Sequence, residues 1–432
     1  MNKDHIRIVK GLLTVAFFVF LGKFAGAIKE IVIAGKFGVG PVVDAYFLVF
    51  TLVIWVPSVW NAIMTSAFVP LSRQSKPEER AQFNRELLGA AFGVSLCLAA
   101  GFLLLMPQLL STLQSDASVR VTVIANQIIP IMSPLIVGGF LVSYFSARLL
   151  AQERHSNTLT EGIPPLCIAI VLLLWPYSLD VFPIAWANLV GVGVQVLVLY
   201  WILRRYAQDF GMAFGFQSPM WRLFKNAIGW LLVGQIIISF NQPIDVYLAS
   251  LTGVGGVSEL GYAKKILALL LGLGATAVGR AILPVLSDQE RGTKATIKIA
   301  HQWAFLMIAA GTVAAVIGWY LSPLAVAVLF ERGEFNASNT EAVAQVLQWG
   351  LFQLPFFFAG IVLVQLTVSL GHYRYIFYTG CLGILIKIVS GYILVDRMGI
   401  PGLMLSTALM YAGNWLLLLL LSRGRFSLGP AH

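Results

Sequence analysis

The stretch that decides the fold is Gly11-Leu-Leu-Thr-Val-Ala-Phe-Phe-Val-Phe-Leu-Gly-Lys23-Phe-Ala-Gly-Ala-Ile-Lys29-Glu30-Ile-Val-Ile-Ala34. The stretch is 24 residues long and mostly apolar, and a helix needs about 20 such residues to cross a bilayer, so a membrane span is predicted. Lys23 and Lys29 lie inside it, and a charge in the hydrocarbon region costs at least ~2.5–3.5 kcal/mol on insertion scales. Charged residues are rare in the hydrocarbon region unless they have a function. The two lysines therefore indicate a site for an anionic ligand.

The rest of the chain repeats this apolar character. Of 432 residues, 58% are hydrophobic and 11% charged, against ~45–50% and ~25% in soluble proteins. We predict an all-α, polytopic membrane protein of about twelve transmembrane helices. The expected spans are residues 8–34, 42–70, 86–111, 119–149, 158–178, 182–203, 222–251, 259–286, 298–322, 341–370, 374–395 and 401–422. The first segment reads as a retained helix rather than a cleaved leader.

Basic residues are distributed unevenly between the predicted loops. Of 29 lysines and arginines, 19 fall on one side of the membrane, six fall within or at the edges of spans, and four fall on the other side. The four are Lys36, Arg120, Arg332 and Arg397. Cytoplasmic loops are enriched in Lys and Arg, so both termini are expected in the cytoplasm. The net charge of +10 therefore reflects topology and does not indicate nucleic-acid binding.

Two similar segments suggest an internal repeat. Ala67-Phe-Val-Pro70-Leu-Ser72 ends the second predicted span, and Ala281-Ile-Leu-Pro284-Val-Leu-Ser287 ends the eighth. An offset of six spans predicts a parallel repeat of two six-helix lobes around a central cationic cavity. The expected division is residues 1–204 for the first lobe, 205–221 for a cytoplasmic linker, 222–422 for the second lobe and 423–432 for a cytoplasmic tail. Coincidence remains the alternative, because proline and serine are common near helix ends.

The charges predicted inside the membrane are mostly positive. The candidate substrate-binding residues are Lys23, Lys29, Glu30, Asp44, Lys264 and Lys265. Clustered lysines can hold a diphosphate as point charges. Two simpler interpretations stay open: Lys265 reaches the outer interface with its long side chain, and Lys29 pairs locally with Glu30. Lys23 has no such explanation, because it lies about ten residues from either end of its predicted helix.

A second group of residues suggests ion coupling. Asp245 follows Asn241 and Pro243 in the seventh predicted span. A carboxylate beside a helix opened by proline is a place where Na⁺ binds in transporters. Lys387 could replace that ion as a fixed counter-charge. No cofactor or metal is expected otherwise. Since no nucleotide-binding loop, zinc-protease motif or catalytic carboxylate pair occurs, the chain is not expected to be an enzyme.

Five segments of the chain can be compared with known families: the run from Gly22 to Phe47, Ser66-Ala-Phe-Val-Pro70, Gly261-Tyr-Ala-Lys-Lys265, Ala281–Ser287 and Val328-Leu-Phe-Glu-Arg-Gly-Glu-Phe335. In this order they resemble the MurJ/MviN family of lipid II flippases. The resemblance implies the multidrug/oligosaccharidyl-lipid/polysaccharide exporter fold, a bacterial inner-membrane location and alternating access. The implied cargo is a polyprenyl-diphosphate-linked saccharide. Membrane lipids and cell-wall or polysaccharide assembly proteins are the other partners it suggests.

The resemblance also marks individual positions. It implies basic residues at Lys23, Lys29 and Lys265, an acid at Glu30, and the family aspartate at Asp44. The chain departs from the pattern in three ways. Pro57 and Ser58 stand where a basic pair is common, Ala268 replaces an acid, and two further C-terminal helices have no counterpart before His432. Lipid II and another polysaccharide precursor therefore both remain candidate cargoes.

Three other functions are alternatives to a flippase. A cation-coupled drug antiporter of the same superfamily is the main alternative, but its cavity would need more acids than cations. A membrane-bound glycosyltransferase would need large extramembrane loops, which the sequence lacks. A scaffold of a cell-wall assembly complex is compatible with the sequence and would differ by lacking transport.

Overall fold

The computed structural model describes residues 21–113, 119–152, 160–175, 180–206, 210–286 and 293–424. Within these ranges the secondary structure is helical, apart from an isolated bridge between Arg332 and Phe335. The all-α prediction is thus confirmed. The chain divides into two compact units, the first ending at Ser239 and the second beginning at Phe240.

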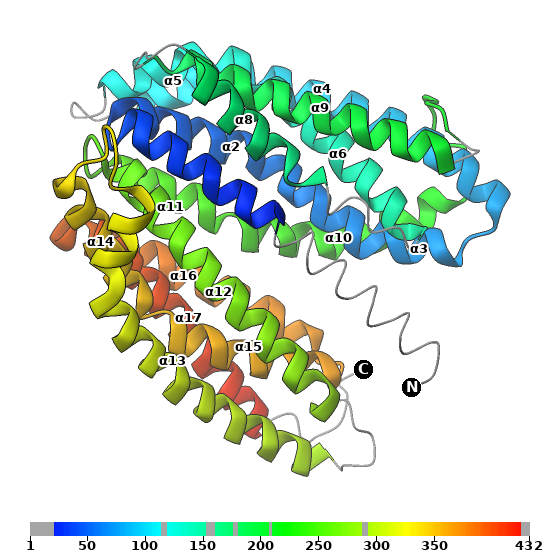
Figure 1. The fold of residues 1–432 in the computed structure, drawn as a ribbon. Coiled ribbons are helices and arrows are strands. Elements are labelled where there is room, and N and C mark those ends of the chain that lie inside the picture. Colours follow the sequence, from blue (N-terminus) through cyan, green and yellow to red (C-terminus); the bar gives the residue numbers. More distant parts are fainter. Residues whose placement is uncertain are drawn as a thin grey trace, which may run out of the picture. The chain divides into compact units, whose positions relative to one another are not determined.

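The first unit opens with a helix over residues 21–37. The helices that follow are α2 Pro41–Ile63, the π-helix η1 Met64–Phe68, α3 Val69–Gln74, α4 Pro77–Leu113, α5 Val119–Met132, α6 Pro134–Ala151, α8 Ile163–Leu174, α9 Phe182–Tyr206 and α10 Met220–Ser239 (Figure 1). The second unit contains α11 Asn241–Ser250, α12 Gly256–Leu286, α13 Thr293–Phe330, α14 Ala337–Leu351, α15 Leu354–Ser369, α16 Tyr373–Met398 and α17 Ile400–Gly424.

The helices coincide with all twelve predicted spans over the described residues. Nine helices in this part of the chain are long and apolar enough to cross a bilayer. The other three predicted spans correspond to the helix at 21–37, the shorter α8 and the lysine-containing α12. Residues 8–20 of the first predicted span lie outside the described residues. The broken fourth, seventh and tenth spans each consist of two consecutive helices.

Proline and glycine set many of the helix ends. Gly38 has a φ of 62° and donates its N–H to the carbonyl of Ala34, as a left-handed residue does after a helix. Pro41 then opens α2, where its missing N–H costs nothing. Pro243 explains the break between α10 and α11. Its ring conflicts with the carbonyl four residues earlier, at Ser239, which is the last residue of α10.

Two helices run further than the sequence predicted. Helix α4 begins at Pro77 rather than near residue 86, and α13 covers Thr293–Phe330 rather than 298–322. In α4, Pro77 is the first helical residue, and Glu78 and Glu79 follow in the first turn. Acidic residues there interact favourably with the positive end of the helix dipole. These polar turns extend the helix beyond the apolar segment that the sequence identified.

An extended segment holds the start of α10 against α4 in the first unit. The backbone N–H of Ala213 donates to the carbonyl of Arg85 at 3.0 Å. A Cβ on Gly89 would lie 2.1 Å from the Ala213 carbonyl oxygen, so a side chain there would not fit. Trp221 packs edge-on against Phe83, with ring centroids 5.0 Å apart. Ala213 and Trp221 therefore attach the segment before α10, and the start of α10 itself, to α4, and α10 belongs to the first unit.

The chain divides into its two compact units between Ser239 and Phe240, and the expected lobes 1–204 and 222–422 with the linker 205–221 remain a prediction. The seventh predicted span is therefore shared: α10 lies in the first unit and α11 in the second. The two repeated proline segments end α3 and α12, and residues 287–292 after α12 lie outside the described residues. The parallel repeat remains a prediction.

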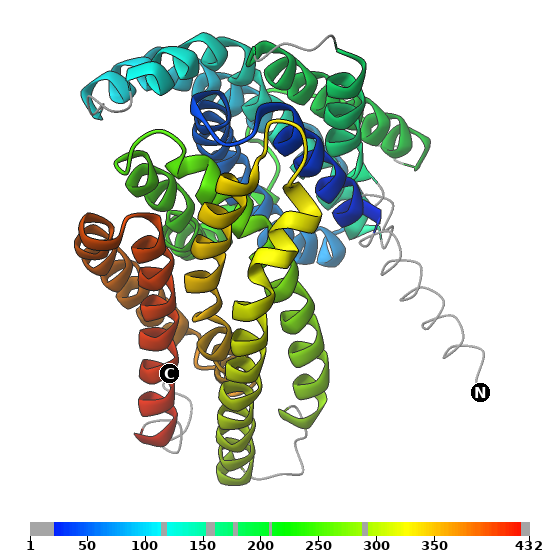
Figure 2. The same cartoon turned by 60° about the vertical axis from the view of Figure 1, so that its left-hand side comes forward.

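Helices α16 and α17 lie side by side in the second unit (Figures 1 and 2). Their close approach depends on glycines that face the partner helix. A Cβ on Gly402 would lie 2.2 Å from the carbonyl oxygen of Leu394, and one on Gly413 would lie 2.3 Å from the Ile386 side chain. Small residues allow such close packing between membrane helices. This packing fixes the relative positions of the polar groups that the two helices carry.

Candidate functional site

Three charged residues from three helices of the second unit meet at one point. Asp245 lies in α11, Lys264 in α12 and Lys387 in α16. The Lys387 ammonium is 2.5 Å from Oδ1 of Asp245, and the Lys264 ammonium donates to Oδ2 of the same carboxylate. Each oxygen of the carboxylate thus has its own cation. We call Asp245, Lys264 and Lys387 the charged triad.

The two lysines of the triad differ in exposure. The Lys387 side chain retains 1% of its accessible surface, and the Lys264 side chain retains 33%. Asp245 itself is buried. Lys264 can therefore be reached from outside the unit, while Lys387 and Asp245 cannot be reached without movement. The difference separates a cation that can meet a ligand from one that cannot.

Lys387 is held by oxygens other than the carboxylate. Its ammonium donates to the hydroxyl of Thr407 and lies 3.4 Å from the carbonyl oxygen of Leu403, both on α17. Carboxylate, carbonyl and hydroxyl oxygens are the ligands that a small cation takes in transporter sites. The Lys387 ammonium thus lies among a carboxylate, a hydroxyl and a carbonyl oxygen, and its role as a counter-charge in place of Na⁺ stays a prediction. No group of three or more histidine, cysteine or acidic residues suited to a metal occurs in the described part of the chain.

The triad carries one positive charge in excess, because two lysines face one aspartate. Removing one partner from a buried ion pair typically costs about 3–5 kcal/mol, since the other charge is left without compensation. Because Asp245 has two lysine partners, the loss of one still leaves its charge compensated by the other. An excess positive charge that is partly accessible is suited to a negatively charged group.

A second pair of charges lies in the first unit. Lys29 and Glu30 are both buried, and Nζ of Lys29 is 2.9 Å from Oε1 of Glu30. The Lys29 ammonium also lies 5.4 Å from the ring centroid of Phe50 on α2, a cation–π contact. The local pairing that the sequence left open is therefore present. Lys29 is held by an acid and an aromatic ring from two helices.

Asp44 is buried in the first turn of α2, where the positive end of the helix dipole stabilises a carboxylate. Lys23 and Lys265 are both exposed on membrane-spanning helices. Lys23 makes no ion pair among the described residues, which suits a side chain available to a ligand. Asn241 is half-buried at the first position of α11, one turn before Asp245.

The structure brings the predicted residues together in two groups. Lys264, Asp245 and Lys387 meet in the second unit, and Lys29 meets Glu30 in the first. These groups lie in separately described units, and their roles in binding or coupling remain predictions. The sequence did not identify Thr407 or Phe50. The signal that could have indicated Thr407 is its hydroxyl group, which stands in an apolar helix one turn after Leu403.

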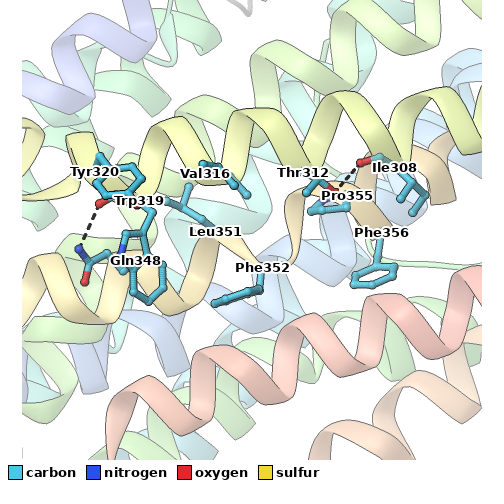
Figure 3. A pocket seen from close by; sticks show the side chains of 11 residues that line it. Ile308, Thr312, Val316, Trp319, Tyr320, Gln348, Leu351, Phe352, Pro355 and Phe356 are labelled. Atoms are coloured by element: carbon cyan, nitrogen blue, oxygen red, sulfur yellow. Dashed lines mark hydrogen bonds between the residues drawn. The ribbon is translucent and has the colours of Figure 1, made fainter.

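The second unit also has an apolar groove of about 370 Å³ (Figure 3). It is lined by α13 and by the adjoining ends of α14 and α15, where the helix is interrupted between Leu351 and Leu354. Gln348 donates its side-chain amide to the carbonyl of Trp319, which satisfies both groups at one end (Figure 3). None of the lining residues is charged. The groove can take an apolar chain but offers no cation to a phosphate, in contrast to the charged triad.

Comparison with known proteins identifies the family. The family model described as "Lipid II flippase MurJ" matches residues 33–432. The chain belongs to this family. The MurJ-family resemblance found in the sequence is therefore confirmed, and the protein is a multi-pass inner-membrane member of a flippase family rather than of an enzyme family.

Individual relatives agree with the MurJ-family assignment. "Lipid II flippase MurJ" of Burkholderia cenocepacia is 26% identical over 455 residues, covering 97% of this chain and 84% of the relative. "Probable lipid II flippase MurJ" of Rhizobium meliloti is 27% identical over 381 residues, covering 81% of this chain and 68% of the relative. These relatives match most of the chain and agree with the family model over residues 33–432.

Solved structures support the same fold. A structure titled "Lipid II flippase MurJ, inward closed conformation" superposes with a TM-score of 0.81 at 21% identity, covering 94% of this chain and 87% of that one. An inward-facing MATE family multidrug transporter of the MOP superfamily gives a TM-score of 0.72 at 16% identity, covering 95% and 94%. At these identities the likeness shows the fold alone.

Proposed function

We propose that this MurJ-family member moves a polyprenyl-diphosphate-linked saccharide from the cytoplasmic to the outer leaflet by alternating access. The observation that carries the proposal is the charged triad, in which two lysines neutralise one aspartate and leave one partly exposed positive charge in a membrane-spanning unit. A diphosphate is the anionic part of such a lipid, and lysine ammonium groups bind phosphate as point charges. Exposed Lys23 and Lys265 add cations of the same kind.

The cargo within this class is proposed to be lipid II or a polysaccharide precursor with the same diphosphate linkage. Relatives named lipid II flippases support the first choice. The lysines recognise the shared diphosphate, so they do not discriminate between sugars. The energy for transport would come from an ion gradient, the membrane potential or consumption of the product.

Drug antiport is a second candidate because the fold is also that of a MATE transporter. A cationic drug would need an accessible acid. Asp245 is buried and already has two ammonium partners. Glu30 is buried against Lys29. The acids described here are thus poorly placed for a cationic ligand, and an anionic cargo is favoured.

Complementation tests the proposal. The chain is expressed in bacteria depleted of their own lipid II flippase, and labelled lipid II is measured at the outer leaflet. Rescue that is lost in Lys23→Ala and kept in Arg120→Ala identifies lipid II as cargo. Arg120 is the matched control, because it is an exposed cation that opens α5 on the predicted outer side.

Lipids that copurify with the protein decide the remaining case. If the protein reaches the membrane without rescue, mass spectrometry of those lipids should show a different polyprenyl diphosphate saccharide. Rescue that persists in Lys23→Ala would remove that residue from the site. Copurification of cationic lipophiles without any lipid diphosphate would contradict the proposal and favour antiport.

A further inference from the structure

The charged triad is asymmetric in a way that its net charge does not explain. Both lysines contact Asp245, yet Lys387 is buried and Lys264 is one-third exposed. Lys387 is also bound by α17 through Thr407 and Leu403. Among the described residues, the Lys264 ammonium donates its hydrogen bond to Asp245. One lysine is therefore fixed on several sides, and the other has a single strong polar partner.

This asymmetry determines which lysine can leave the aspartate. A buried carboxylate that loses its last cationic partner is left uncompensated in a medium of low polarity, which is strongly unfavourable. With Lys387 in place, Asp245 keeps one ammonium when Lys264 departs. Lys387 cannot make the same move, because it is enclosed by the closely packed pair α16 and α17. Lys264 is thus the exchangeable partner.

We propose that Lys387 is a permanent counter-ion for Asp245 that releases Lys264 to bind the diphosphate of the substrate. In the empty protein Lys264 rests on Asp245, and substrate binding transfers its ammonium from carboxylate to phosphate. Lys387 is then a positioning residue that acts through Asp245 and does not touch the substrate. The inference rests on the proposed function for the identity of the anion. The competition between Asp245 and an anion for Lys264 rests on the geometry.

The accessibility of Lys264 is the direct measure of this arrangement. The protein is placed in lipid nanodiscs in sodium-free buffer and treated with an amine-reactive reagent, and labelling of Lys264 is followed by mass spectrometry. Exposed Lys298 of α13 is the internal reference in each digest. In Lys387→Met, Lys264 becomes the sole cation on Asp245 and should label more slowly than in the unmodified protein.

Replacing the aspartate should reverse this effect. In Asp245→Asn and in Lys387→Met/Asp245→Asn, Lys264 loses its carboxylate and should label faster than in the unmodified protein. A purely structural role for Lys387 gives the opposite sign in the single variant, because loosened packing would speed labelling. If Lys387→Met does not fold, Asp245→Asn alone still tests whether the carboxylate restrains Lys264.

Ligand binding is measured separately with farnesyl diphosphate as the probe. Lys387→Met should weaken binding about tenfold, within the usual range of coupling between linked sites. Lys387→Met/Asp245→Asn should restore it. Faster or unchanged Lys264 labelling in Lys387→Met, or unchanged labelling in Asp245→Asn, overturns the inference. Absence of farnesyl diphosphate binding by the unmodified protein counts against the proposed function instead, since the labelling order does not depend on the ligand.

Discussion

Trp221 donates its indole N–H to Oε2 of Glu86 over 2.7 Å, which joins the start of α10 to α4 by a buried side-chain hydrogen bond. The backbone N–H of Ser218 donates to the same oxygen at 3.1 Å, and Gln82 donates to the other oxygen at 2.9 Å. Glu86 is itself buried. A single carboxylate therefore satisfies three donors where the segment between α9 and α10 meets the first unit.

Replacing Glu86 by alanine should destabilise this attachment. Each buried donor left without a partner typically costs about 1–3 kcal/mol. We expect a lower unfolding temperature in detergent and faster trypsin cleavage at Arg222. Glu78→Ala is the control, because Glu78 is exposed in the first turn of α4. Equal protease resistance in the two variants would show that Glu86 does not hold the segment.

The Lys29–Glu30 pair predicts a non-additive pattern of stability. Lys29→Met removes one member of a buried pair, a change that typically costs about 3–5 kcal/mol. Lys29→Met/Glu30→Gln should recover much of that loss, because no buried charge is then left. Lys23→Met should change stability little, since Lys23 is exposed. Thermal unfolding of the unmodified protein, Lys29→Met, Glu30→Gln and the double variant measures the interaction, with Lys23→Met as the control, and strictly additive losses would contradict it.

Lys387 predicts how the protein responds to sodium. Its ammonium occupies the space among the oxygens of Asp245, Leu403 and Thr407. Replacing choline chloride by sodium chloride should therefore leave the melting temperature unchanged. Lys387→Ala opens that space and should gain a sodium-dependent increase, because a ligand that binds only the folded state stabilises it. A specific sodium effect in the unmodified protein would show that another ion site exists.

The α16–α17 contact predicts a difference between two glycines. In Gly402→Ala the new Cβ would lie 2.2 Å from the Leu394 carbonyl oxygen, so the helices must separate. Overpacking of this kind typically costs about 1–3 kcal/mol. Gly360→Ala is the matched control, because no atom lies within 4 Å of its Cβ position. The unfolding temperature should fall in the first variant and stay level in the second.

Much of the architecture could be predicted from the sequence, because apolar segments of span length have few alternatives to helices in a membrane. The helix break before Pro243 also follows from the missing N–H and the ring clash. The length of α4 could not be predicted in the same way. Its first turns are polar, so hydropathy ended the span near residue 86 although helix-start signals continue back to Pro77.

The candidate site was predicted as residue types rather than as contacts. The sequence indicated Asp245 and Lys387 as possible partners, and the structure places them 2.5 Å apart. From the sequence, Lys264 was expected to bind the substrate only, whereas the structure shows that Lys264 also pairs with Asp245. The contact links α11 to α12, and it exists only because the second unit folds so that these two helices lie together. Sequence spacing cannot give the distance between side chains on different helices.

The π-helix Met64–Phe68 has a consequence for the end of the second predicted span, where α3 begins. A π-turn accommodates one residue more than an α-turn, so it shifts the helical register of all that follows. If the same residues adopted α-geometry instead, each turn would hold one residue fewer and α3 would rotate by about 100°. Arg73 now donates to the carbonyl of Leu150 at the end of α6, and that rotation would turn it away. The extra residue of the π-turn thus determines which face of α3 points toward the end of α6.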